Sequence, residues 1–443
     1  MKKVLIGLGI ISTVVVIGVP YATGVVAETK SKELVEQFNE NYPQLGAIEI
    51  LNYERSFRSS ASTYKYTFSD IYKKATKFSS IEYDCDLGHG VTGVDYACSL
   101  TKNGEQKAFF DKYFSGKDPF SMTGNISAFG EIDQTLTVDP VVIQIENGGV
   151  ITISEKIVLN TVYDQKSSSY DFDGKIPEFK IEDTESNDPV VMSVNTVILE
   201  GEITEIKNGL YVGDVNLSGD QIKLQVKGAN EKMLISDFEI ESSTSEAGAT
   251  ISSSAQVNAK SATIPNQNGK SDSFSDVNMS IGVYGMETEA LAEYIKFNQE
   301  FQKKIFASGD DSQQALSEMA ELIPVAEELL KKDLGINVKS SAKVDGQASN
   351  FSLDFKLLND MKFSQMMGFL FSPDETLENF KGNVDLELNK TLIEKYPQLA
   401  FATASLPVFE QKPDSLVMNI NIDNGMKLNG QKTTVEELQR LFR

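Results

Sequence analysis

The sequence predicts a mainly β protein with some helix (α+β), built on elongated antiparallel β-meander sheet. Alternation of apolar and polar residues with a period of two runs through most of the chain, as in half-buried strands. Asn-Gly and Asp-Gly dipeptides recur between the alternating segments and favour tight hairpin turns. The sequence shows no regular alternation of strand and helix patterns, which a parallel sheet would require. Strands joined by tight turns form an antiparallel meander with one buried and one wet face.

The first 27 residues carry an export signal. Two lysines precede an uncharged run at residues 4–19, and this order keeps the lysines on the cytoplasmic side. A retained signal-anchor is favoured, because the run extends to residue 26 and Tyr21 occupies an interfacial position. A cleaved signal ending near residues 25–27 is the alternative. We therefore expect a membrane-anchored protein with its bulk outside the cytoplasm, or a soluble exported one.

Composition excludes some partners. The formal net charge is −23, which argues against nucleic acid and against a cationic patch for anionic lipid headgroups. Hydrophobic residues make up 40% of the chain, as in folded proteins, and exceed what disordered chains contain. The 443 residues suffice for two domains or one elongated domain.

Cys85 and Cys98 are the two cysteines of the chain. In an oxidising compartment a close pair of this kind predicts a disulfide, which would stabilise the fold by about 3 kcal/mol in the chain-entropy model. Two free thiols are the alternative.

The elements follow in order along the chain. A short helix is expected at 32–41, and strands are expected at 62–68, 150–153, 196–199, 222–226, 234–240 and 277–281. Residues 241–275 are expected to form polar strands, with a linker as the alternative. Hairpin turns are predicted at Asn103-Gly104, Asn147-Gly148, Asp173-Gly174, Asn208-Gly209, Asn268-Gly269, Asp345-Gly346 and Asn424-Gly425.

Helical spacing replaces the alternation between about residues 287 and 334. Gly309 divides two apolar stripes there, and Pro324 should kink or divide the second. Strands resume at 336–344 and 350–358, a short helix is expected at 361–371, and a strand at 416–422. Thr434 is expected to cap a last helix at 435–442. The predicted organisation is a signal-anchor at 1–27, a β-rich periplasmic region at 28–285, a helical pair at 286–335 and a C-terminal β region with short helices at 336–443.

Several short segments resemble motifs of one bacterial family. They are residues 21–24 (Tyr-Ala-Thr-Gly), 52–60, His89-Gly90, 423–425 and 428–431. In this order they resemble the YdgA-like proteins, also called domain of unknown function 945. The chain departs from the family pattern at Ser56, Phe57, Gly88 and Val91. The resemblance implies a self-associating inner-membrane or periplasmic protein of a Gram-negative bacterium, and it implies no mechanism.

Catalytic chemistry has little support in the sequence. His89 is the only histidine, so a Ser-His-Asp, Cys-His or zinc site would have to include it. The interpretation favoured here is a turn residue beside a disulfide, and His89 with Gly90 is the candidate functional turn. We assign no catalytic residue, no metal ligand and no cofactor.

The sequence leaves two non-enzymatic functions open. The first is a membrane-anchored scaffold, with the inner membrane and a second copy of the chain as partners. The alternative is a carrier or conduit for lipid or another apolar ligand along an extended sheet. The carrier function is suggested by the large number of strands with one apolar face and the small number of helices that could cover those faces. An enzyme, with hydrolysis as the default reaction, is the least favoured class.

Overall fold

The structure is a computed structural model. It describes residues 32, 35–36, 38–39, 45–56, 59–69, 79–89, 93–101, 104–127, 130–145, 149–183, 190–207, 209–226, 232–265, 271–308, 323–362, 364–365, 377–423 and 425–441. The chain divides into two units: the first contains residues 1–204 and 299–310, and the second contains residues 205–298 and 311–443.

The first unit begins with five antiparallel strands around a packed core. These are β1 (Gly46–Arg55), β2 (Ser59–Phe68), β3 (Ser80–His89), β4 (Gly93–Leu100) and β5 (Phe120–Ser127), each paired with the next. Helix α4 (Gly104–Tyr113) connects β4 to β5. The alternate residues of β2 from Ser60 to Phe68 are all buried, and they share a core with Leu87, Val94 and Phe110.

The remaining strands of the first unit form long arms that are interrupted at one level. The strands are β6 (Glu131–Val138), β7 (Val141–Ile145), β8 (Gly149–Ile153), β9 (Ile157–Asp164), β10 (Ser169–Ile176), β11 (Phe179–Asp183) and β12 (Val190–Lys207). In one half of the arms β6 pairs with β9, and β9 pairs with β10. In the other half β7 pairs with β8, and β8 pairs with β11. Both β10 and β11 pair with the long strand β12. The breaks after Val138, Ile153 and Ile176 are therefore aligned. When each interrupted pair is counted as one arm, the order is a plain meander, as predicted.

The second unit continues as an antiparallel meander. It contains β13 (Leu210–Val226), β14 (Lys232–Ala247), β15 (Thr250–Pro265), β16 (Ser271–Glu287), β17 (Gly335–Val344), β18 (Gln347–Leu357), β19 (Phe380–Asn389), β20 (Glu410–Gln411), β21 (Ser415–Ile422), β22 (Met426–Leu428) and β23 (Gln431–Thr433). Consecutive strands pair from β13 to β19, and β21 pairs with β19, β20 and β22. Residues 241–275 lie in or between strands β14–β16, so the polar-strand interpretation is confirmed.

The apolar alternation slips by one residue at the same level in four strands of the second unit. In β14 the apolar residues before Asp237 are the odd-numbered Met233 and Ile235, whereas those after it are the even-numbered Phe238 and Ile240. Asp237 has a left-handed backbone with φ of 49°, and Asp276 of β16 has the same φ. Strand register is kept across this level between β13 and β16. A one-residue slip that neighbouring strands share bends the strands without breaking their pairing.

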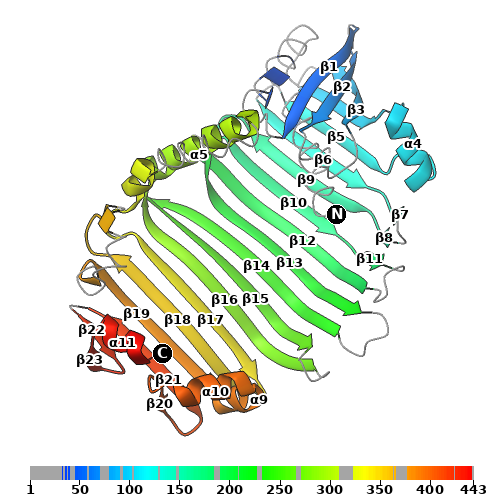
Figure 1. Ribbon diagram of the computed structural model, residues 1–443. Helices are drawn as coiled ribbons and strands as arrows, with labels where there is room; N and C mark the ends of the chain where they lie inside the picture. The colour runs from blue at the N-terminus through cyan, green and yellow to red at the C-terminus, as the bar shows by residue number, and fades with distance from the viewer. Residues whose placement is uncertain are drawn as a thin grey trace. The chain divides into compact units, whose positions relative to one another are not determined.

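Helices of the second unit lie at the ends and edge of its sheet (Figure 1). They are α5 (Thr288–Ser308), whose residues 288–298 belong to this unit, α9 (Lys390–Lys395), α10 (Pro397–Ser405) and α11 (Val435–Leu441). The predicted cap of the last helix is confirmed, because the Glu437 amide donates to Thr434 Oγ1 at 3.1 Å. The Thr434 amide in turn donates to the Glu437 carboxylate at 3.0 Å, which completes a capping box.

Two predicted turns are wrong. Asp173 and Gly174 lie inside β10, where Gly174 pairs with Leu159 and Leu199. A Cβ at Gly174 would come within 2.9 Å of the Leu159 side chain, so close packing, and no turn, accounts for the glycine. Gly104 begins helix α4, which the sequence analysis did not predict. By contrast, Asp345-Gly346 joins β17 to β18 with φ of 50° and 81°, as a type I′ turn requires.

Mostly antiparallel β-sheet with few helices confirms the predicted class. The expected membrane helix at 1–27, Gly90, Gly309, the first part of the expected helix at 312–334 and most of the expected helix at 361–371 lie outside the described residues. Residues 323–329, around Pro324, are described and helical, as expected for the end of the second apolar stripe. Within the part of the chain that is described, no helix has the length and hydropathy needed to cross a membrane.

Candidate functional site: an open apolar face

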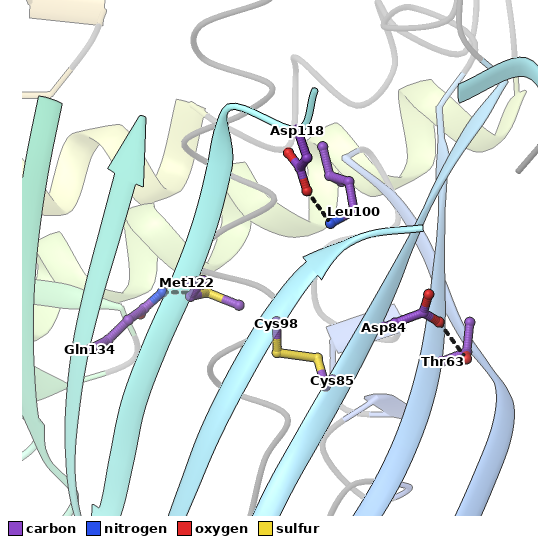
Figure 2. The surroundings of a disulfide bond; sticks show 8 residues. All are labelled: Thr63, Asp84, Cys85, Cys98, Leu100, Asp118, Met122 and Gln134. Atoms are coloured by element: carbon purple, nitrogen blue, oxygen red, sulfur yellow. Dashed lines mark hydrogen bonds between the residues drawn. A yellow bond between two sulfur atoms is a disulfide. The ribbon is translucent and has the colours of Figure 1, made fainter. Parts of the chain in front are cut away.

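The two cysteines form a disulfide within the core of the first unit. Cys85 of β3 and Cys98 of β4 are directly paired across the strands, with Cα atoms 4.1 Å apart, and both are buried (Figure 2). Met122 of β5 is the cross-strand partner of Cys98, and its Sδ accepts a hydrogen bond from Gln134 Nε2 of β6 at 2.7 Å. The disulfide thus links two strands that already pair, and its burial indicates a structural role.

His89 ends β3, and its Nε2 lies 3.1 Å from Ser60 Oγ. This is a serine–histidine contact, but Ser60 is buried among the core-facing residues of β2. His89 Nδ1 is also buried, and no described group pairs with it. Among the described residues the contact therefore lacks the orienting carboxylate that a Ser-His-Asp arrangement needs.

Carboxylates gather near these strands without forming a metal site. A shallow hollow of about 550 Å³ on the solvent face of β1–β4 has Glu54, Asp86 and Asp95 at its rim. Asp95 Oδ1 accepts a hydrogen bond from Asn125 at 2.7 Å. Among the residues that the structure describes, no group of three or more His, Cys, Asp or Glu side chains is arranged to hold a metal ion.

The most distinctive surface lies in the second unit, where apolar residues of neighbouring strands form rows. One row runs through Ile240, Val257 and Met279, which are directly paired across β14, β15 and β16. The next row contains Ile281 and continues through Val338, Leu353, Val384 and Ile420 as far as β21. Beyond the slip, Leu224 and Ile264 occupy the same side of their strands.

Seven large side chains on this side of β13–β17 are exposed to solvent, whereas Val338, Leu353 and Val384 further along the second row are half-buried. The exposed fractions of the seven range from 37% to 52%, with Met279 the highest. We call this set the open face, and its members are Leu224, Ile240, Val257, Ile264, Met279, Ile281 and Ile336. Isolated apolar residues are common on protein surfaces, and a set gathered on one side of adjacent strands is a candidate interaction site.

Helix α5 covers one end of the strands on the side that carries these rows. Ala292 and Ile251 are completely buried against each other and Leu210, with Leu291, Ile295 and Met286 packed around them. Ile251 lies on β15 six residues before Val257, on the same side of the strand by alternation. The open face therefore begins where the contacts of α5 end.

Helix α11 covers the edge of the rows at β21 and β22. Val435 packs with Ile422 and Met426, and Leu438 lies against Phe355 and Ile420. Ile420 and Ile422 belong to the same rows as Ile281 and Ile336. The apolar rows are thus covered at this edge and exposed between it and α5.

The segment α9–α10 is fixed at the other end. Tyr396, between the two helices, donates its hydroxyl hydrogen to Asp272 Oδ2 at 2.7 Å, and Lys395 Nζ lies 3.4 Å from Asp272 Oδ1. Asp272 is buried and is the cross-strand partner of Ile264, a member of the open face. Burial and, secondarily, this carboxylate raise the pKa of Tyr396 to about 12.

The disulfide and the excess of apolar strand faces are predictable from the sequence, but the identity of the residues that stay exposed is not. Alternation within the expected strands 234–240 and 277–281 puts Ile240 on the apolar side of the first, and Met279 and Ile281 on the apolar side of the second. Nothing in their spacing distinguishes them from the buried alternation of β2. The Asp272–Tyr396 contact spans 124 residues, and no local signal points to it.

Comparison with curated proteins and with solved structures finds no match. The sequence model of one family, described as bacterial protein of unknown function (DUF945), matches residues 1–436. This match spans both units and includes every residue of the open face, of the disulfide and of α9–α10. The chain therefore belongs to the DUF945 family of bacterial proteins.

Proposed function

We propose that this protein is a non-enzymatic, membrane-anchored periplasmic protein that binds the acyl chains of lipid along the open face of its second unit. The observation that carries the proposal is the exposure of seven large apolar side chains on adjacent strands. Leaving such a set in water costs free energy, at about 25 cal/mol for each Å² of apolar surface. An apolar occupant removes that cost.

The helices α5 and α11 beside the open face favour a narrow ligand, such as an acyl chain, over a second β-sheet packed on it. Sheets pack face to face at about 10 Å, which is also about the diameter of a helix. The helices α5 and α11 rest on the same side of the sheet as the open face, through Ala292 and Val435. They would hold a second sheet away from much of the open face. An acyl chain, by contrast, fits between the helices and contacts the strands directly.

The composition of the open face also suits acyl chains. It consists of Ile, Leu, Val and Met, without an aromatic ring or a charged group among its seven members. A face of this kind offers apolar contact and no directional hydrogen bonds, so we expect binding by chain length and not by headgroup. The non-enzymatic assignment agrees with the burial of Ser60 beside His89.

Site-specific photocrosslinking tests the proposal in the full-length chain. Benzoyl-phenylalanine replaces Met279 on the open face, and in the control it replaces Ser280, the next residue on the opposite side of β16. After irradiation of cells, we expect intact-protein mass spectrometry to detect an adduct of phospholipid mass at position 279 only. Crosslinked dimers at position 279, equal lipid adducts at both positions, or no lipid adduct would overturn the proposal. The dimer outcome would instead support the scaffold function.

A further inference from the structure

We propose that helix α10 contacts the surface of a phospholipid bilayer and that acyl chains pass there between the bilayer and the open face. This inference rests on the proposed function and adds the place at which lipid enters. Phe401 of α10 is 78% exposed, compared with 52% for Met279, the most exposed member of the open face. An aromatic ring this exposed on a short helix suits insertion between lipid headgroups.

The charge around α10 suits the same contact. Residues 396–408 contain no charged side chain, and three lysines and three acids cancel over residues 390–414, although the whole chain carries a net charge of −23. An acidic protein is repelled by an anionic bilayer, so contact requires a segment without net negative charge. The segment α9–α10 meets this requirement.

Continuity with the open face is the third observation. Tyr396 and Lys395 immediately precede α10, and both contact Asp272. Asp272 pairs with Ile264, which is a member of the open face. Helix α9 is fixed to the sheet as well, because the Asn389 side chain caps its first turn and donates to Gln347 O at 2.9 Å. Helix α10, which carries Phe401, therefore begins beside Asp272, at the Ile264 end of the open face.

Tryptophan fluorescence gives a local test, because the chain contains no tryptophan. The full-length Phe401→Trp protein is reconstituted into phosphatidylcholine vesicles with either ordinary or brominated acyl chains. We expect blue-shifted emission and quenching of about twofold or more by the brominated lipid, as for a ring within the interface. The matched control is Leu51→Trp, since Leu51 is an exposed apolar residue of β1 in the first unit, and it should not be quenched.

Each outcome decides the inference. An unquenched tryptophan at position 401, or equal quenching of the two variants, would overturn the bilayer contact, and a lipid adduct at position 279 would then leave the proposed function standing. Quenching at position 401 without an adduct at position 279 would overturn the transfer role together with the proposed function. If both experiments succeed, Phe401→Ser should lower adduct formation at position 279 by about tenfold, the scale expected from losing one buried aromatic ring.

Discussion

The strands β1–β5 and the strands β13–β17 follow the same alternating pattern, but their apolar sides differ in solvent exposure. In β2 the residues from Ser60 to Phe68 alternate between buried and partly exposed, and the apolar side is sealed by Leu87, Val94 and Phe110. In β14–β17 the apolar side includes Ile240, Met279 and Ile336, which remain about two-fifths to one-half exposed. The comparison teaches that alternation specifies a side of a strand, whereas a third element decides whether that side becomes a core or a binding surface.

The largest predicted difference between the two regions is the effect of removing apolar side chains. Leu87→Ala should cost about 3–5 kcal/mol, because Leu87 is fully buried and the change leaves a cavity. Ile281→Ala should cost less than about 1 kcal/mol, because this side chain is already partly hydrated. Hydrogen exchange of peptides from β2–β4 and from β15–β16 measures the two regions separately. Equal losses of stability from Leu87→Ala and Ile281→Ala would show that the open face is covered in solution.

The disulfide should matter nearly as much. Replacing both Cys85 and Cys98 by alanine should lower the stability of β2–β5 by about 3 kcal/mol, from the loop-closure entropy of a loop of this length. Strands of the second unit contain no cysteine, so their exchange rates should stay unchanged. Loss of protection in β15–β16 as well would mean that the two units unfold together. A change below about 0.5 kcal/mol in β2–β5 would contradict the structural role of the disulfide.

The shared slip across β13–β16 predicts a smaller effect. Asp237→Val should cost about 1–2 kcal/mol, because a β-branched residue is strained at a φ of 49°. Asp237→Gly should be neutral within about 0.5 kcal/mol, since glycine relieves strain while the exposed ion pair with Lys260 is lost. Thermal unfolding of the two variants compares them directly. The opposite order would show that Asp237 is not left-handed.

The smallest predicted effect concerns Tyr396. Its pKa is raised to about 12 by burial and by Asp272, so the folded chain retains the proton more strongly than the unfolded chain does. The stability contributed by protonated Tyr396 is thus fully present below pH 10 and is lost as pH rises towards about 12. The stability difference between wild type and Tyr396→Phe should shrink across this range. Taking the difference also cancels the titration of half-buried Tyr83 and buried Tyr96, whose pKa values are raised by desolvation.

Local signals in the sequence were sufficient for much of the second unit. Asp345-Gly346 forms its turn and Thr434 caps α11, because each depends on backbone conformations and hydrogen bonds within a few residues. The strands β14–β16 were expected from alternation alone. The family resemblance is borne out by the match over residues 1–436.

Other features needed the tertiary structure. Asp173-Gly174 has the composition of a turn but lies within β10, because the neighbouring strand brings Leu159 against Gly174. Asp237 has a left-handed backbone because the strands on both sides slip at the same level.

The sequence by itself determined the antiparallel meander, the disulfide pair and the side of each strand that is apolar. Only the tertiary structure decided that Leu87 is buried while Met279 is exposed, and that Asp272 holds Tyr396 at the end of the open face. The physical reason is the distance along the chain over which each interaction acts. Alternation and turn chemistry depend on neighbours within a few residues, whereas the covering of a face depends on elements that arrive from distant parts of the chain.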